Sequence, residues 1–283
     1  MKIGLGTHFN ALVGAATLNQ VRALGFRMVR IDAQQSDGPL TRTMIAETVA
    51  ADLEPYVIVR DANQLRWVLP GTKVELRNEP DIEGPDAATY RAFLVDMAQG
   101  AIEYDLQLYA PAISNLNRRG FAYLRELGEM PATVHGSLHW YAHGSNPQTP
   151  HPGSSSREDE VNTWLGHIGG GQPWGVSESG FHTARRRRYT DWRKNLPLYD
   201  RWTDLDVVTY VEAEIAFWAR MGAEFYLLFQ LNDGPEDIPE HRFGIRSGVF
   251  HENGSIDWTW KPVAYVLGLS PFLRLAPQAN KSP

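Results

Sequence analysis

Residues 74–80 read VELRNEP, a short apolar run that takes up charge and then breaks at an Asn-Glu-Pro tripeptide. In a strand, alternation places Glu75, Arg77 and Glu79 on one side and the apolar residues on the other. If this strand belongs to a closed barrel, its outer face packs under helices and the charged side chains point inward. Buried charges must be paired or hydrogen-bonded. The stretch therefore predicts an internal ion-pair network, with Glu79 at the strand's carboxyl end.

Similar short runs recur along the chain and alternate with amphipathic stretches typical of helices. We expect strands at Lys2–Leu5, Met28–Ile31, Tyr56–Val59, Lys73–Arg77, Leu106–Tyr109, Val134–His139, Trp174–Ser177 and Phe225–Phe229. Eight such units predict a (β/α)8 TIM barrel, typically ~250 residues long, as one catalytic domain over residues 1–283. A doubly wound open sheet is the alternative, but no glycine-rich phosphate turn follows the first strand.

Three expected βα loops are long. They follow the sixth, seventh and eighth strands and span residues 143–156, 179–202 and 231–254. All three fall on the face of a barrel where active sites are built. The sequence therefore predicts a barrel elaborated on one rim, with a binding cleft there.

Composition narrows the function classes. Lys and Arg number 27 against 33 Asp and Glu, for a formal net charge of -6. This acidic balance argues against nucleic-acid binding, which leaves a basic footprint. The absence of cysteine excludes disulfides, thiolate metal sites and a cysteine nucleophile. No apolar run approaches the roughly 20 residues that span a bilayer, so we expect no membrane partner.

A second glutamate occupies a matching place on the seventh strand. The segment WGVSESG runs from Trp174 through Glu178 to a turn at Gly180. In a barrel, Glu79 and Glu178 would face each other across the mouth. Carboxyl groups ~5–5.5 Å apart suit retaining glycoside hydrolysis, whereas ~6.5–9.5 Å indicates inversion.

These residues resemble a known family. RNEP at the end of the fourth strand and SESG at the end of the seventh resemble glycoside hydrolase clan A, the retaining TIM-barrel glycosidases that include family 5. The likeness extends along the chain to four further segments. It covers VRIDA on the second strand, LHWY (Leu138–Tyr141) on the sixth, FGI (Phe243–Ile245) and WKPVAY (Trp260–Tyr265).

The resemblance implies a role for each matching position. Glu79 would be the general acid/base and Glu178 the nucleophile. Asn78 would hydrogen-bond the sugar 2-hydroxyl. Arg30 and Tyr141 would hold Glu178 ionised and oriented, because a nearby cation favours a carboxylate. The remaining implied contact, to the sugar or to the acid/base, comes from His139.

One position departs from the family pattern. Many clan members carry a tryptophan at the end of the eighth strand, under the reacting sugar, where this chain has Phe229. Either Phe229 supplies the stacking face, or a loop tryptophan such as Trp140 or Trp192 does. His8, at the end of the first strand, is expected to contact the sugar or to form a hydrogen bond at the top of the barrel.

Two further features of the sequence, the histidines and a run of arginines, receive the simpler structural interpretation. The first strand carries one histidine rather than a His-any-His pair, and the other histidines lack ligand spacing, so we expect no metal. The run Arg185–Arg188 is expected to be a solvated surface, with a preference for acidic sugars as the alternative. No cofactor is expected.

We therefore predict a monomeric retaining β-glycosidase that acts on a carbohydrate, with endo-action on a β-linked polysaccharide or oligosaccharide preferred. An exo-β-glycosidase or a transglycosylase on the same scaffold is the alternative. From other classes, a metal-dependent barrel isomerase or hydrolase and a non-catalytic carbohydrate-binding barrel remain open. The N-terminus does not resemble a signal peptide, so the expectation is a cytoplasmic protein, or a secreted one if a leader has been removed.

Overall fold

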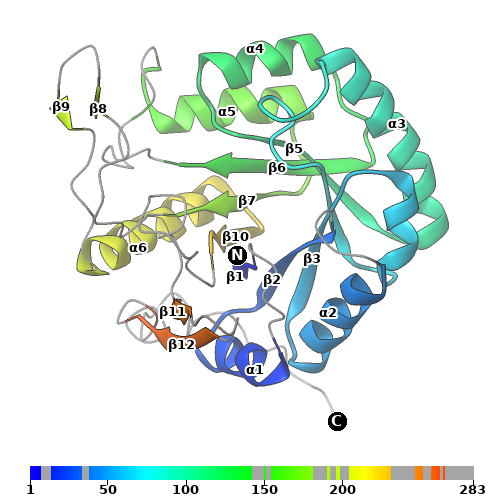
Figure 1. The fold of residues 1–283 in the computed structure, drawn as a ribbon. Helices are drawn as coiled ribbons and strands as arrows, with labels where there is room; N and C mark the ends of the chain where they lie inside the picture. The colour runs from blue at the N-terminus through cyan, green and yellow to red at the C-terminus, as the bar shows by residue number, and fades with distance from the viewer. Residues whose placement is uncertain are drawn as a thin grey trace.

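The computed structural model describes residues 1–7, 14–33, 38–141, 150, 154–180, 190–191, 196–197, 204–230, 246–250, 256–261 and 264. Eight parallel strands close into a barrel in the order β1-β10-β7-β6-β5-β4-β3-β2 (Figure 1). They are β1 (Lys2–Gly6), β2 (Met28–Asp32), β3 (Glu54–Val59), β4 (Lys73–Leu76), β5 (Gln107–Ile113), β6 (Val134–Trp140), β7 (Trp174–Ser179) and β10 (Phe225–Leu228). Each matches a predicted strand, and the predicted (β/α)8 fold is confirmed.

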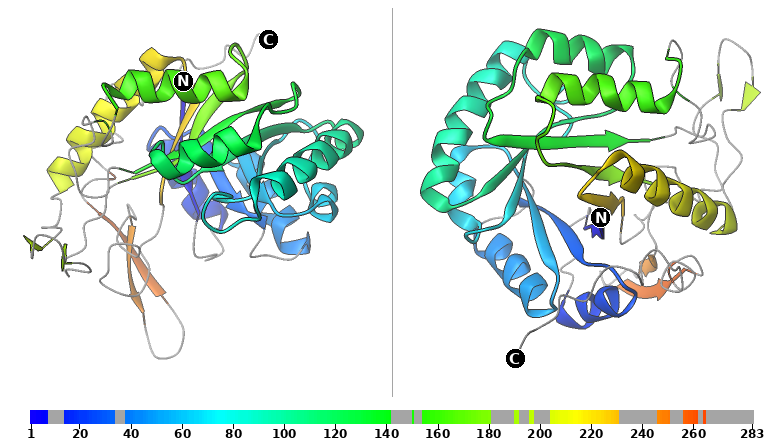
Figure 2. Two further views of the ribbon diagram at one scale, coloured as in Figure 1. Left: turned by 90° about the horizontal axis from the view of Figure 1, so that it is seen from above. Right: turned by 180° about the vertical axis from the view of Figure 1, so that it is seen from behind.

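Helices lie between successive strands and surround the barrel (Figure 2). Side chains of Asp86, Asn117 and Ser156 accept hydrogen bonds from backbone N–H groups at three of the helix starts, which satisfies donors that the helix cannot. The described helices are α1 (Ala15–Ala23), α2 (Gly38–Ala50), α3 (Ala87–Tyr104), α4 (Arg118–Leu127), α5 (Arg157–Ile168) and α6 (Asp204–Met221). The short third gap holds a 3-10 helix, η2 (Ala62–Trp67), capped by Asp61.

The barrel interior is divided into an apolar layer and a polar layer. Met28, Tyr56, Tyr109, Phe225 and Leu227 are buried together near the starts of their strands. Their rings pack at tilted angles, with the Tyr56 and Phe225 centroids 5.0 Å apart. Polar and charged side chains occupy the interior further along the strands. The apolar layer therefore closes the barrel beneath the end where the predicted site lies.

Strand β4 ends one residue earlier than predicted, and this changes where the side chain of Arg77 lies. The backbone of Arg77 has φ 65°, in the left-handed region, so the strand alternation stops at Leu76. The Arg77 guanidinium lies 4.8 Å from the ring centroid of Phe93 on α3. The prediction that Arg77 points into the barrel is wrong, because the backbone turns before alternation can carry it there. Glu75 is fully buried, as predicted.

The C-terminal part of the described chain adds an antiparallel pair, β11 (Arg246–Phe250) and β12 (Ile256–Trp260), which stands apart from the barrel in Figure 2. Trp260 donates its indole N–H to Gln20 on α1, at 3.0 Å. A second short pair joins β8 (Thr190–Asp191) and β9 (Leu196–Pro197). The predicted long loops after β6, β7 and β10 lie largely outside the described residues.

Among the helices that the structure describes, none combines the length and apolarity needed to cross a membrane.

Candidate active site

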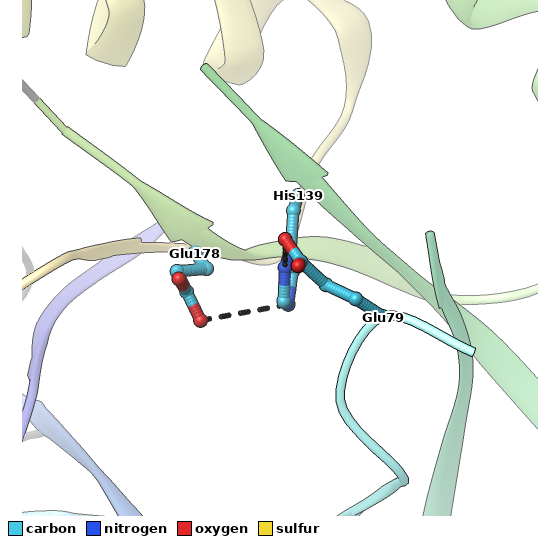
Figure 3. A group of neighbouring side chains, drawn as sticks. All are labelled: Glu79, His139 and Glu178. Atoms are coloured by element: carbon cyan, nitrogen blue, oxygen red, sulfur yellow. Dashed lines mark hydrogen bonds and ion pairs between the residues drawn. The ribbon is translucent and has the colours of Figure 1, made fainter. Parts of the chain in front are cut away.

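Two glutamates and a histidine meet at the carboxyl ends of the barrel strands (Figure 3). Glu79 follows β4, Glu178 lies near the end of β7, and His139 near the end of β6. One carboxylate oxygen of each glutamate and a ring nitrogen of His139 all lie within 4.8 Å of one another. The structure therefore brings together the two glutamates that were predicted at the carboxyl ends of the fourth and seventh strands.

The backbone around Glu79 is unusual. Glu79 has φ 41°, a left-handed conformation that non-glycine residues seldom adopt and that costs of order 1–3 kcal/mol. Its carbonyl accepts hydrogen bonds from the N–H groups of Ile82 and Glu83, both at 2.9 Å. A Cβ on Gly84 would lie 2.6 Å from the Pro80 backbone, so this turn needs glycine there. The tight turn fixes the strained Glu79 backbone and aims its side chain across the mouth.

Glu178 lies instead within β7, beside an irregularity in the register of that strand, and is nearly buried. Both of its oxygens are held: Arg30 donates from Nη1 to Oε2 at 2.5 Å, and the Tyr141 hydroxyl donates to Oε1 at 2.5 Å. Hydrogen bonds from a cation and a phenol favour the ionised form of a carboxylate. The arrangement suits a carboxylate that must stay anionic and keep one orientation.

Arg30 is shared between several acceptors. Its Nη2 donates to Glu75 Oε1 at 2.5 Å and to Asn78 Oδ1 at 2.9 Å, while Nη1 serves Glu178. Burial alone would lower the pKa of Arg30, but Glu75 and Glu178 outweigh it and raise that pKa. The guanidinium is therefore a fixed cation that joins β2, β4 and β7.

His139 is fully buried among the charged groups. Its Nδ1 lies 3.1 Å from Glu79 Oε1, and its Nε2 lies 3.3 Å from Arg30 Nη2 and 3.8 Å from Glu178 Oε2. Burial lowers the pKa of the imidazole, but Glu178 and then Glu75 and Glu79 outweigh it and raise the pKa to about 10. The three carboxylates around His139 therefore favour its protonated form.

Beneath this layer, sequence reasoning missed a set of hydroxyl groups. Tyr56 and Ser137 both donate to Glu75 Oε2 at 3.1 Å, and Ser137 lies 2.7 Å from Ser177. Alternation on β6 contains the signal, because Ser137 shares a side with His139. Burial raises the pKa of Tyr56, and the Glu75 charge raises it further, so Tyr56 stays a neutral donor.

Hydrogen bonds between loops link the Glu79 side of the site to the Glu178 side. Strand alternation does not predict these contacts. Asp81 accepts from the N–H of Ser114 at 2.8 Å and from its hydroxyl at 2.7 Å. The neighbouring Asn115 donates to the carbonyl of Tyr141 at 3.1 Å. The end of β5 therefore ties the loop that carries Glu79 to the residue that holds Glu178.

The aromatic residues predicted to contact the sugar lie in different places. Phe229 packs edge-on against Tyr141, with ring centroids 6.3 Å apart, and so lies beside the site. Trp140 packs on the helix side of the sheet, 5.6 Å from the Trp218 ring and 4.5 Å from the Arg157 guanidinium. That position corrects the expectation of a Trp140 sugar platform, because the indole is covered by α5 and α6. The remaining candidates, His8, Trp192 and Arg185–Arg188, fall outside the described residues.

Glu79, His139 and Glu178 are also the residues in the described part of the chain whose donor atoms are close enough to bind a metal ion. A cation bound to Glu178 would lie against the Arg30 guanidinium, whose Nη1 is 2.5 Å from Oε2. Like charges at such a distance repel strongly where solvent is excluded. The donor set therefore fits a metal poorly.

A small polar hollow of about 200 Å³ adjoins the site. It is lined by Arg60, Arg77, Asn78, Glu83 and Gly84. Burial and the nearby Glu79 raise the pKa of Glu83. The hollow extends the polar surface from Asn78 toward the ends of β3 and β4.

Comparisons with known proteins show which solved structures share this fold. No protein-family model matches the chain. No curated protein matches it either. Many solved structures match the chain, and three of them align over 90% or more of it.

A Rhizomucor miehei β-1,3-glucanosyltransferase in complex with laminaritriose has TM-score 0.57 at 10% identity, covering 90% of this chain and 95% of that one. A GH128 endo-β-1,3-glucanase from Sorangium cellulosum has TM-score 0.55 at 13% identity, covering 99% and 100%. An exo-β-1,4-mannosidase from Opitutaceae bacterium strain TAV5 has TM-score 0.59 at 13% identity, covering 97% and 59%. The chain shares its TIM-barrel fold with these three enzymes.

Proposed function

We propose that the protein is a retaining glycoside hydrolase that cleaves β-glycosidic bonds by double displacement. The observation that carries the proposal is the pair Glu79 and Glu178, whose nearest carboxylate oxygens lie within 4.8 Å at the carboxyl ends of β4 and β7. Oxygens this close are compatible with the ~5–5.5 Å between the carboxyl groups of retaining enzymes and favour them over the ~6.5–9.5 Å of inverting ones.

In the first step, Glu178 attacks the anomeric carbon while Glu79 donates its proton to the leaving oxygen. The C–O bond to the leaving group breaks as the bond from Glu178 forms, which gives a glycosyl-enzyme and a free alcohol. Arg30 and Tyr141 hold both oxygens of Glu178, so the attacking carboxylate is anionic and aimed. Pre-orientation of this kind lowers the entropic part of the barrier.

In the second step, Glu79 removes a proton from water, and the water oxygen displaces Glu178 from the anomeric carbon. The β-configuration is restored and Glu79 is protonated again for the next cycle. His139 contacts Glu79 at 3.1 Å and keeps the side chain over the site in both protonation states. A single residue can act first as acid and then as base because each step reverses its charge.

Two further residues suit substrate binding. The side-chain oxygen of Asn78 accepts from Arg30, so its amide N–H₂ is available to donate to a sugar hydroxyl. Phe229 lies beside Tyr141 and offers an aromatic face or edge to the reacting sugar. Both assignments follow from the sequence resemblance and are compatible with the positions in the structure.

For the substrate, we favour endo-action on a β-linked polysaccharide, with β-1,3-glucan tested first. A β-1,3-glucanosyltransferase and an endo-β-1,3-glucanase are among the similar structures. Exo-action and transglycosylation are the rivals on the same scaffold, since an acceptor sugar can replace water in the second step.

The test is a screen of wild type against Glu178→Ala on β-1,3-glucan, β-1,4-glucan, β-mannan, xylan and galactan. We expect reducing ends from one substrate with wild type alone, and a β-configured first product by NMR. Labelled oligosaccharides then separate internal cleavage, terminal cleavage and chain transfer by their products. An α-configured first product from a β-linked substrate would overturn the retaining mechanism.

A further inference from the structure

A third carboxylate, Glu75, lies below the two proposed catalytic glutamates. Its side chain is fully buried on β4 inside the barrel. A buried carboxylate is costly unless it is paired, and a barrel can fill this position with an apolar residue. The contacts of Glu75 show what a charge at this position does.

Glu75 shares a single cation with Glu178. Arg30 Nη2 lies 2.5 Å from Glu75 Oε1, and Nη1 of the same guanidinium lies 2.5 Å from Glu178 Oε2. Each carboxylate therefore bonds to one arm of a planar fork whose arms cannot move independently. The Glu75 bond fixes the rotation of the fork, and this fixes the arm that Glu178 meets.

The other Glu75 oxygen is held by hydroxyl groups, so the carboxylate cannot swing away. The ionisable groups that contact Glu75 come from three strands, and a fourth strand shares its cation. They are Arg30 on β2, Tyr56 on β3 and His139 on β6, while Glu178 on β7 binds the same Arg30. Burial raises the pKa of Glu75, but Arg30 and His139 outweigh it and keep that pKa below its usual range. Glu75 thus stays an anion under the site.

We propose that Glu75 is a positioning residue that orients Arg30 and divides its positive charge, so that Glu178 is held without being over-stabilised as an anion. The inference rests on the proposed glycosidase function. A carboxylate that had the whole guanidinium charge to itself would be a weaker nucleophile, because nucleophilicity follows basicity. Glu75 therefore tunes the reactivity of Glu178 from one layer below.

The charge balance supports this arrangement. With Glu79 protonated for the first step, Glu75 and Glu178 carry two negative charges, and Arg30 and His139 carry two positive ones. Removal of the Glu75 charge leaves an excess positive charge around Glu178. The anions of both Glu178 and Glu79 are then stabilised, and Glu178 is affected more because it shares Arg30 directly.

The test is Glu75→Gln, which keeps the acceptor oxygen for Arg30 and removes the charge. We expect the acid limb of the kcat/KM–pH profile to move down by about one unit, the size of shift that a charge at this range produces. Formation of the glycosyl-enzyme should slow about three- to tenfold, because nucleophilicity follows only part of a change in basicity. The control is Tyr56→Phe, which removes a hydrogen bond to Glu75 but no charge and should leave the acid limb in place.

Glu75→Asp is a second variant, which keeps the inference testable if Glu75→Gln does not fold. It keeps the charge but withdraws it from Nη2, so the acid limb should shift in the same direction by less. A folded Glu75→Gln with an unchanged acid limb and rate would overturn the inference, and so would failure of both variants to fold, because Glu75 would then serve the fold alone. If wild type itself cleaves no β-glycoside, the proposed function fails instead, which the polysaccharide screen detects separately.

Discussion

The ends of β4 and β7 carry the same side chain in two different settings. Glu178 lies within β7 beside a register irregularity, 9% exposed, with each oxygen held by its own donor. Glu79 lies on a left-handed backbone just past its strand, is half-buried, and contacts His139 through one oxygen. The first setting holds both carboxylate oxygens, and the second holds one, on a side chain that is 18% exposed against 11% for that of Glu178.

The difference shows how one residue type can fill two chemical roles. Donors that favour the charged form hold both oxygens of Glu178, whereas Glu79 contacts His139 through one oxygen. Arg30 and Tyr141 make the distinction, because each of them donates a hydrogen bond to Glu178. The asymmetry can be tested by removing each side in turn.

Glu178→Ala should have the largest effect. Loss of the nucleophile should lower kcat on the order of 10⁴–10⁶-fold, the range found when the attacking residue of a covalent mechanism is removed. A good leaving group should not help, because nothing attacks the anomeric carbon. Added azide should restore turnover of an activated aryl β-glycoside and give an α-glycosyl azide, which NMR identifies. A β-azide would exchange the two roles and break the comparison.

Glu79→Ala should have a smaller effect that depends on the leaving group. Loss of acid catalysis should cost about 10²–10⁴-fold on natural linkages. Glycosyl-enzyme formation from a dinitrophenyl glycoside should stay fast, because that leaving group needs no proton. A burst of phenolate followed by slow turnover is expected in stopped-flow measurements, and azide should give a β-glycosyl azide. Equal losses on both substrate types would show that Glu79 is not the acid.

Much of this site could be predicted from the sequence, because alternation turns Arg30, Glu75 and His139 inward and buried charges need partners. Glu178 is the exception, because a register irregularity in β7 lets both Ser177 and Glu178 face the interior, against alternation. The same rule places Trp140 outside, since it is adjacent to His139 on β6 and must face the other way. The interpretation of Trp140 as a platform failed because it treated a strand residue as part of a loop.

Alternation fails where the backbone leaves the strand. Because Arg77 has a left-handed backbone conformation, its side chain lies against Phe93. No residue pattern in the sequence predicts that turn. The bonds from Ser114 to Asp81 join loops that lie 33 residues apart in the sequence. Such contacts depend on how the barrel closes and can be obtained only from the structure.

Tyr141→Phe sharpens the comparison on the Glu178 side. Burial raises the pKa of Tyr141 well above its usual value and Glu178 raises it further, so the phenol is a neutral donor throughout the working range. Loss of this donor should lower kcat/KM about ten- to a hundredfold and move the acid limb to higher pH, because the carboxylate anion loses stabilisation. This direction is opposite to that expected for Glu75→Gln. A downward shift in Tyr141→Phe would show that the phenol does not stabilise the anion.

His139→Gln tests the Glu79 side through stability. The pKa of folded His139 is raised to about 10, above the ~6.5 of an unfolded histidine. The imidazolium therefore stabilises the fold fully below pH ~6.5, and this contribution is lost as pH rises toward 10. Relative to His139→Gln, the unfolding free energy of wild type should fall by about 1 kcal/mol per pH unit between pH 7 and 10. Urea titrations of both proteins measure this difference, and parallel curves would mean that His139 is neutral beside Glu79, which would leave Arg30 as the sole cation among the three carboxylates.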